Sequence, residues 1–228
     1  MLVFRRFLLL VFIALPVLLT GQDMTVEQSY LHQSIENMII REMSRGDSRE
    51  MKLVALEYIG NAIERGNMSD EVRVSLEHLS MEGTGNIIRE SGRVTNNYPG
   101  IRTAAATHLG QFQTVEAKDA LVKMVLLDNE PMVITEAIKS LSTIGIDEGG
   151  EVVSAINWMV DRFDRNVPND LLAISAMEAF ETFAEINGYV NPASIRTVMR
   201  IIEGPYSTPV RARARQSLEI LRGYRYEQ

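Results

Sequence analysis

The sequence predicts an all-α protein, a right-handed α-solenoid of about five helical hairpins and roughly ten helices. The first observation is a pattern that occurs five times, in which a small residue lies four positions after one apolar residue and four positions before another. The small residue is alanine in every copy: Ala55, Ala105, Ala137, Ala176 and Ala214. These alanines are spaced by 50, 32, 39 and 38 residues, a period typical of stacked helical hairpins.

Composition gives the second observation. Hydrophobic residues make up 46% of the 228 residues and aromatic residues only 7%, which favours helix packing through Leu, Ile, Val, Ala and Met. No stretch shows the two-residue alternation of a half-buried strand. Cys is absent, which excludes disulfides, thiolate catalysis and thiolate metal ligands, and leaves packing as the source of stability.

The first 22 residues differ from the rest and predict a secretory signal peptide, followed by one helical domain over residues 23–228. Arg5 and Arg6 precede an unbroken apolar run over 7–19. The run is shorter than the roughly 20 apolar residues that a membrane span needs, and it contains Pro16. We therefore expect an exported, periplasmic protein that does not span the membrane once mature. The alternative is an N-terminal anchor in the inner membrane.

The elements are expected in the following order. A first helix over 25–45 has capping-box spacing between Thr25 and Gln28. Four repeats of two helices and one final helix follow, at 47–81, 99–128, 130–164, 168–203 and 207–223. Gly, Pro, Asn and Asp are frequent at the breaks between them, as expected for residues that stop and start helices.

Residues 81–97 interrupt this order. The segment is rich in Gly, Ser, Thr and Asn, and it accounts for the long spacing between the first two alanines. We expect at most one helical turn in it, at 87–89. Long loops in compact arrays are often functional, so the segment is a candidate contact region, with a tolerated insertion as the alternative.

The spacing of the pattern explains its residue types. Residues four apart lie on one face of a helix, so a central alanine permits close approach of a neighbouring helix. The Gly that ends some copies is expected to help the helix end and reverse. The basic residues in second place (Lys52, Arg102 and Arg211) are expected to pair with acidic residues of neighbouring repeats, each exposed pair contributing ~0.2–1 kcal/mol.

The segment 99–145 resembles a known family. Its P-x-I-R-x-x-A-x-x-x-L-G start, its E-A-x-x-A-L helix and its D-N-E-P turn are similar to the HEAT repeats, in the short bacterial form shared with the bilin lyases. The resemblance covers about residues 47–222 and implies a helical-repeat fold. Five positions depart from the usual Gly or Arg of that family: Ser142, Glu181, Glu219, Ile134 and Ala173. Resemblance to a repeat indicates the fold alone and does not imply the reaction of a bilin lyase.

The residues that carry chemistry do not indicate an enzyme, a metal site or a cofactor. His32, His78 and His108 lie on separate predicted helices without metal-ligand spacing. No glycine-rich loop is followed by the Lys-Ser or Lys-Thr of a phosphate site. The net charge is −7, and −9 without the two arginines of the predicted signal peptide, which argues against binding of nucleic acid. The basic run at 211–215 is expected to spread around its helix as a solvated cap.

The expected partner is another protein or a peptide segment, an acidic one being favoured by the basic residues of a candidate strip. In arrays of this kind the second helix of each repeat lines the inner face. Trp158 points away from the buried stripe of its predicted helix, and an exposed tryptophan beside an arginine is a frequent interface anchor. Residues of three successive inner helices form the strip: Lys123, Trp158, Arg162, Arg196 and Arg200. Alternatively, Trp158 covers the groove between adjacent repeats.

These observations predict a non-catalytic scaffold or adaptor of the cell envelope that binds through a preformed surface. One alternative is a bilin-lyase-like or chaperone-like factor that handles a bound chromophore or polypeptide, which carboxylates converging near Trp158 would favour. Another is an assembly piece that self-associates through the C-terminal helix, because the fifth repeat lacks a second helix.

Overall fold

The computed structural model describes residues 26–165 and 167–226, so the predicted signal peptide and the predicted cap Thr25 lie outside the described residues. The described chain is all-α, with ten α-helices, one short 3₁₀ turn, η2 (Glu148–Gly150), and four strands of two residues each. None of its helices combines the length and the apolar character that crossing a bilayer requires. The chain divides into two compact parts, residues 1–35 and 36–228.

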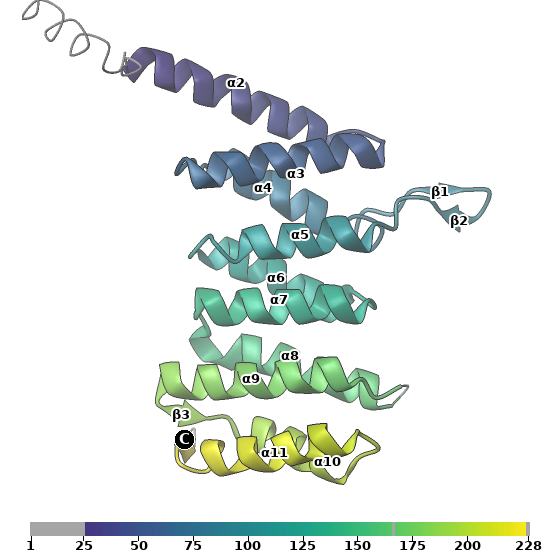
Figure 1. The fold of residues 1–228 in the computed structure, drawn as a ribbon, viewed down its shortest axis with the longest axis vertical. Helices are drawn as coiled ribbons and strands as arrows, with labels where there is room; N and C mark the ends of the chain where they lie inside the picture. Colours follow the sequence, from purple (N-terminus) through teal and green to yellow (C-terminus); the bar gives the residue numbers. More distant parts are fainter. Residues whose placement is uncertain (1–25, 166, 227–228) are drawn as a thin grey trace, which may run out of the picture. The chain divides into compact units, whose positions relative to one another are not determined.

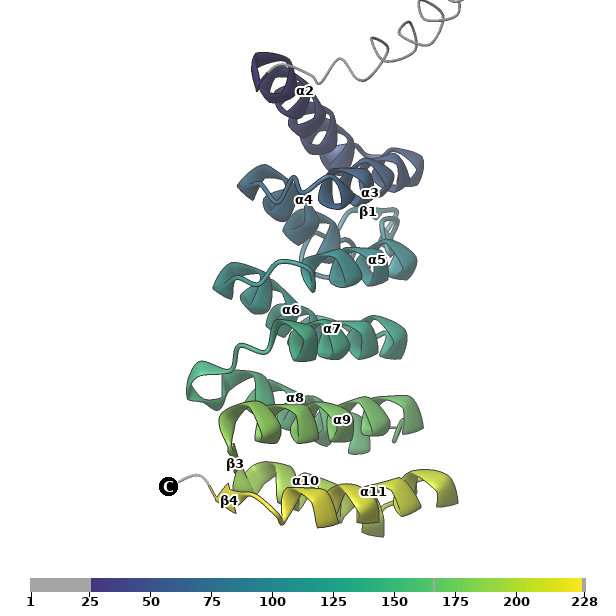
Figure 2. The ribbon, with the colours of Figure 1, turned by 60° about the vertical axis from the view of Figure 1, so that its left-hand side comes forward.

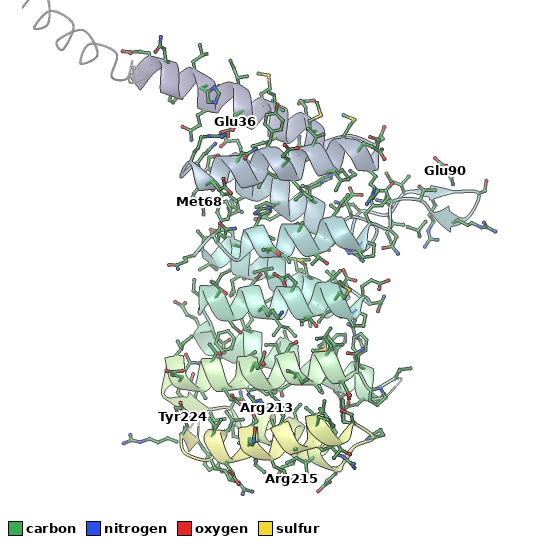
Figure 3. The ribbon with its side chains drawn as sticks, viewed as in Figure 1. Glu36, Met68, Glu90, Arg213, Arg215 and Tyr224 are labelled. Atoms are coloured by element: carbon green, nitrogen blue, oxygen red, sulfur yellow. The ribbon has the colours of Figure 1, made fainter. Side chains whose placement is uncertain are left out.

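Helix α2 (Val26–Arg45) contributes to both parts. In the first part, described over 26–35, the side chains of Tyr30, Leu31 and Ile35 are exposed. In the second part, the buried carboxylate of Glu36 accepts hydrogen bonds from Arg65 and Asn67 in the turn after α3 (Figure 3).

The second part contains two layers of helices (Figures 1 and 2). The A layer consists of the helices that carry the pattern: α3 (Arg49–Glu64), α5 (Pro99–Leu109), α7 (Pro131–Ile144), α9 (Asp170–Asn187) and α11 (Thr208–Leu221). The B layer consists of the helices between them: α4 (Asp70–Ser80), α6 (Val115–Leu127), α8 (Glu151–Asp164) and α10 (Pro192–Glu203). Each helix packs against the next one in its layer, and each B-layer helix packs against the A-layer helix that follows it.

Local signals in the sequence set the helix boundaries. The side-chain oxygens of Ser48, Thr114 and Asn169 accept hydrogen bonds from amides in the first turns of α3, α6 and α9. Proline occupies the first turn of α5, α7, α10 and α11, where its missing N–H is not needed. Gly145 and Gly188 end α7 and α9 with φ angles of 69° and 73°, which favour glycine.

The central alanines of the pattern lie in the core of the second part. All five have a relative exposure of 0%: Ala55, Ala105, Ala137, Ala176 and Ala214. Because Ala ends at Cβ, the backbone of a neighbouring helix can approach closely at each of these points. This confirms the prediction that the small residue faces the core.

The glycine of the pattern ends a helix in one of its two copies. Gly60 lies inside α3, which continues to Glu64, whereas Gly110 directly follows α5 as its C-cap residue. A Cβ added at Gly110 would lie 2.8 Å from both Cβ and Oγ of Ser140 on α7, and one added at Gly60 would lie 3.4 Å from Cε1 of His108 on α5. Gly110 therefore makes room for the next A-layer helix, and the contact at Gly60 is looser.

The basic residues of the pattern also differ from the prediction. Lys52 Nζ lies 2.8 Å from Glu82 Oε1, just after α4. Arg102 binds both carboxylate oxygens of Asp128, just after α6, at 2.6 and 3.1 Å. Each pair therefore joins the two helices of one repeat rather than neighbouring repeats. The four side chains are buried, and removing one partner of such a pair typically costs ~3–5 kcal/mol. Arg211 instead donates to Thr208.

Residues 81–97 include a β-hairpin in place of the expected helical turn. β1 (Arg89–Glu90) pairs antiparallel with β2 (Arg93–Val94). Ser91 and Gly92 between them both have positive φ, as in the two-residue turns that match the twist of a hairpin. The hairpin projects from the helices beside α5 (Figure 1).

Asn96 fixes the base of this hairpin. Its Nδ2 donates to Glu82 Oε2 and to the carbonyl oxygen of Asn86, and its Oδ1 accepts from the N–H of Ile88. Glu82 in turn binds Lys52 on α3. The hairpin is therefore attached to the helices by a buried polar network.

The last helix packs against both α9 and α10. Arg213 forms a two-pronged ion pair with Glu181 on α9, with N–O distances of 2.6 and 2.8 Å, while Arg215 lies exposed on the opposite side of α11 (Figure 3). After α11, the strand β4 (Arg225–Tyr226) pairs in parallel with β3 (Tyr189–Val190). The described end of the chain thus returns to the turn between α9 and α10.

Replacing Gly110 with Ala should destabilise the protein by about 1–3 kcal/mol, because the added methyl group overlaps Ser140. Gly100→Ala is the matched control: it lies at the other end of α5, an added Cβ meets no atom within 4 Å, and it should be neutral or stabilising by up to ~1 kcal/mol. Urea unfolding measures both. Equal effects of the two substitutions would contradict the close approach of α5 and α7.

Stability should fall as the pH drops below about 6.5, the pKa of an unperturbed histidine. Burial lowers the pKa of His78 and of His108 in the folded protein; for His78, Glu82 opposes this shift while Lys52 and Arg45 add to it. The unfolded chain therefore binds protons more readily than the folded protein. The free energy of unfolding is thus highest above the histidine pKa of the unfolded chain, and it decreases as the pH falls below that value.

Urea unfolding at about pH 7.5 and about pH 5.5 measures this loss. His108→Gln should make it smaller. The same loss in His108→Gln as in the unsubstituted protein would show that protonation of His108 does not contribute.

Candidate protein-binding surface

Two contacts hold α6 alongside α8 in the B layer. Near the start of both helices, Lys118 Nζ lies 3.1 Å from Glu151 Oε1. Near their ends, Arg162 Nη1 donates to the carbonyl oxygen of Leu126 at 2.8 Å. These contacts fix the register of the two helices, so that residue 123 lies level with residue 158.

Two further contacts hold α8 alongside α10. Asn157 Nδ2 donates to Ser194 Oγ at 3.5 Å, and Arg200 Nη1 donates to Asp161 Oδ1 at 2.8 Å. By this register, residue 158 lies level with residue 196. The same stripe of each helix is exposed, so residues at one level on α6, α8 and α10 form one continuous surface.

Three of the five predicted residues lie at this level. Lys123, Trp158 and Arg196 are exposed on α6, α8 and α10. Trp158 is the single tryptophan of the chain, and its relative exposure is 46%. The side chains of Lys123 and Arg196 form no hydrogen bond or ion pair with other described residues.

Arg162 was predicted as a contact residue, but the structure gives it a positioning role. Its guanidinium carbon lies 5.0 Å from the ring centre of Trp158 and 5.1 Å from that of Phe163. Its two Nη atoms donate to the carbonyl oxygens of Leu126 and Asp128, at 2.8 and 2.7 Å. Arg162 therefore satisfies carbonyls at the end of α6 and covers part of the indole through a cation–π contact.

Asp128 links this surface to the interior. Its carboxylate is the partner of buried Arg102, and its carbonyl oxygen accepts from Arg162. Burial lowers the pKa of Arg162, and the charge of Asp128 opposes this shift, so the guanidinium stays protonated at neutral pH. The position of Trp158 thus depends on a chain of contacts that begins at the A layer.

Arg200 is exposed in part, and it is engaged in ion pairs. It binds Asp161 Oδ1 at 2.8 Å and Asp164 Oδ2 at 2.9 Å. Arg165 binds the second oxygen of Asp161 at 2.5 Å, and the hydroxyl of Tyr206 donates to Asp164. Burial and the carboxylate of Asp164 raise the pKa of Tyr206, which keeps this hydroxyl protonated. The carboxylates of Asp161 and Asp164, on the same helix as Trp158, are therefore neutralised by arginines.

Sequence reasoning missed two apolar residues of this surface. Leu127 and Met199, with relative exposures of 53% and 42%, lie on α6 and α10 one turn beyond Lys123 and Arg196. Their spacing of four and three residues from these cations was the available signal. Toward α4 the surface has mixed charge, because Glu77, Glu116 and Asp119 line a depression together with Arg73 and Lys123.

Within the described residues, no group of three or more His, Asp and Glu side chains is placed to hold a metal ion. The sequence matches none of the protein-family models and none of the curated proteins with which it was compared.

Arg162→Ala should destabilise the protein by about 1.5–3 kcal/mol, because it removes charge-assisted hydrogen bonds to two carbonyl oxygens. Arg196→Ala is the control, since that side chain is exposed and unpaired, and it should stay within about 0.5 kcal/mol. Urea unfolding followed by tryptophan fluorescence measures both variants. Similar stability of the two would mean that Arg162 does not anchor Trp158.

Proposed function

We propose that the protein is a non-catalytic scaffold or adaptor of the cell envelope that binds another protein through the B-layer surface around Trp158. One observation carries this proposal: the single tryptophan is almost half exposed, is held by Arg162, and lies between Lys123 and Arg196, two cations that form no ion pair with other described residues. Tryptophan is enriched among the residues that dominate binding energy at interfaces.

The proposed architecture is a right-handed α-solenoid of HEAT-like repeats. The two layers, the buried alanines and the regular packing of each helix on the next support it. In this architecture each repeat places one B-layer helix beside the last, so contact residues are held at fixed spacing. A partner then binds without the cost of ordering the surface.

The proposed location is the periplasm. Support comes from the sequence before the described residues, where Arg5 and Arg6 precede an apolar run too short for a membrane span. An exported chain without Cys relies on packing for its stability, and the layers of this chain are closely packed.

Two observations favour binding over the alternatives. The carboxylates of Asp161 and Asp164 are held by Arg200, so they are poorly placed for acid–base chemistry on a bound chromophore. The exposed side of α11 carries polar residues such as Arg215, Gln216 and Glu219, as at the end of a repeat array, which gives little support to self-association there.

Photocrosslinking in the native cells tests the proposal. A photoreactive residue in place of Met199, one turn from Arg196, should give a discrete adduct with an envelope protein. Trp158→Ala in the same chain should remove at least 90% of this adduct, because the anchor is lost. A photoreactive residue in place of Met132, which is exposed on α7 in the A layer, is the control and should give none.

Thermal unfolding of Trp158→Ala should confirm that the variant stays folded, since almost half of Trp158 is exposed and it is not among the buried core residues. An adduct that persists in the folded variant, or equal adducts from the A and B layers, would refute the proposed surface.

A further inference from the structure

We infer that the B-layer surface around Trp158 recognises an acidic segment of its partner, which places a bulky apolar side chain on the indole and carboxylates beside Lys123 and Arg196. This inference rests on the proposed function and names the chemistry of the occupant. We base the inference on the local charge, on the two available cations and on the dimensions of the surface.

The surface is basic although the protein is acidic. From the level of Lys123, Trp158 and Arg196 to residues 127, 165 and 203, the charged residues that are not buried are five basic and three acidic ones: Lys123, Arg162, Arg165, Arg196 and Arg200, with Asp161, Asp164 and Glu203. The chain as a whole carries a net charge of −7. A positive region attracts acidic partners, which favours their association rate and orientation.

Two of these cations are available to a partner. Asp161 is shared by Arg165 and Arg200, and Asp164 also binds Arg200. Lys123 and Arg196 have no such partner among the described residues, and they lie on either side of Trp158. A carboxylate from a partner would therefore form a new pair at each position without breaking an existing one.

The spacing of the helices sets the length of the segment. Neighbouring packed helices are typically 8–10 Å apart, so Lys123 and Arg196, two helices apart, are separated by roughly 16–20 Å. An extended chain rises about 3.3 Å per residue, so carboxylates about six residues apart would reach both cations. The residue midway between them would lie over Trp158.

Apolar side chains beside the indole favour a bulky residue at this middle position. Leu127 and Met199 are exposed on either side of the surface, and Met adapts its shape to apolar partners. Glu116, which lines the depression beyond Lys123 and forms no ion pair with other described residues, would repel carboxylates placed further toward α4. The segment is therefore confined to α6, α8 and α10.

The charge around Trp158 can be measured without a ligand, because the chain has one tryptophan. With protein purified from the cell envelope, iodide should quench its fluorescence more strongly than caesium, relative to the same ratio for free N-acetyltryptophanamide. Lys123→Glu with Arg196→Glu should lower this iodide-to-caesium ratio at least twofold. Lys139→Glu, an exposed charge reversal on α7, is the control and should leave the ratio unchanged. No effect of the double reversal would overturn the inference.

Binding is tested with a Gly-Ser peptide of about twelve residues that carries two Asp six apart and a Phe midway. It should shift the Trp158 fluorescence and bind at least tenfold more tightly than a peptide with Lys in place of Asp, or with Ser in place of Phe. No binding, equal binding of the Lys peptide, or tighter binding of an oligothymidylate of similar length would overturn the inference. Tighter binding of the oligothymidylate would indicate that Lys123 and Arg196 bind phosphate groups.

The crosslinking assay separates this inference from the proposed function. Suppose that Trp158→Ala removes the adduct from position 199 but that the double charge reversal at Lys123 and Arg196 does not. This result would support the binding surface and contradict an acidic occupant. Loss of the adduct in both variants, with Lys139→Glu unaffected, is the result expected for an acidic segment.

Discussion

Close packing of successive A-layer helices is the constraint on which the rest of the structure depends. The five central alanines of these helices have no exposed surface, and Gly110 lets the end of α5 approach Ser140 on α7. Because each B-layer helix packs on the A-layer helix that follows it, the spacing of the A layer also sets the spacing of α6, α8 and α10. The surface around Trp158 therefore inherits its geometry from small residues on the other layer.

A second set of contacts connects the A layer to the side chain of Trp158 in the B layer. Arg102 on α5 binds the carboxylate of Asp128, whose carbonyl oxygen binds Arg162, whose guanidinium lies against Trp158. Each step uses a charged group with a fixed partner, so the indole is positioned by three residues: Arg102, Asp128 and Arg162. Side chains held in this way lose little freedom when a partner binds, which raises affinity for a given contact area.

The sequence predicted the features that depend on one helix at a time. Periodicity was enough to bury the alanines and to expose Trp158, because each statement concerns one face of one helix. Features that depend on two elements were less accessible. The room that Gly110 provides is defined by Ser140 on α7, and the acceptors of Arg162 are backbone carbonyls, which have no signature in the sequence. The spacing also could not show that Lys52 and Arg102 turn toward their own repeats. The Ser91-Gly92 dipeptide was the signal for the hairpin, and it was outweighed by the short apolar run before it.

The attachment of the hairpin at Asn96 has a consequence for its variation. All of its fixed contacts lie at or before the level of Ile88 and Thr95, so residues beyond that level touch only each other and solvent. Adding two residues to each strand would preserve the alternation of side chains, the alternation of hydrogen-bonded pairs and the turn, and would leave the helices unchanged. The reach of the projecting arm can thus evolve in steps of four residues, separately from the layers that carry it.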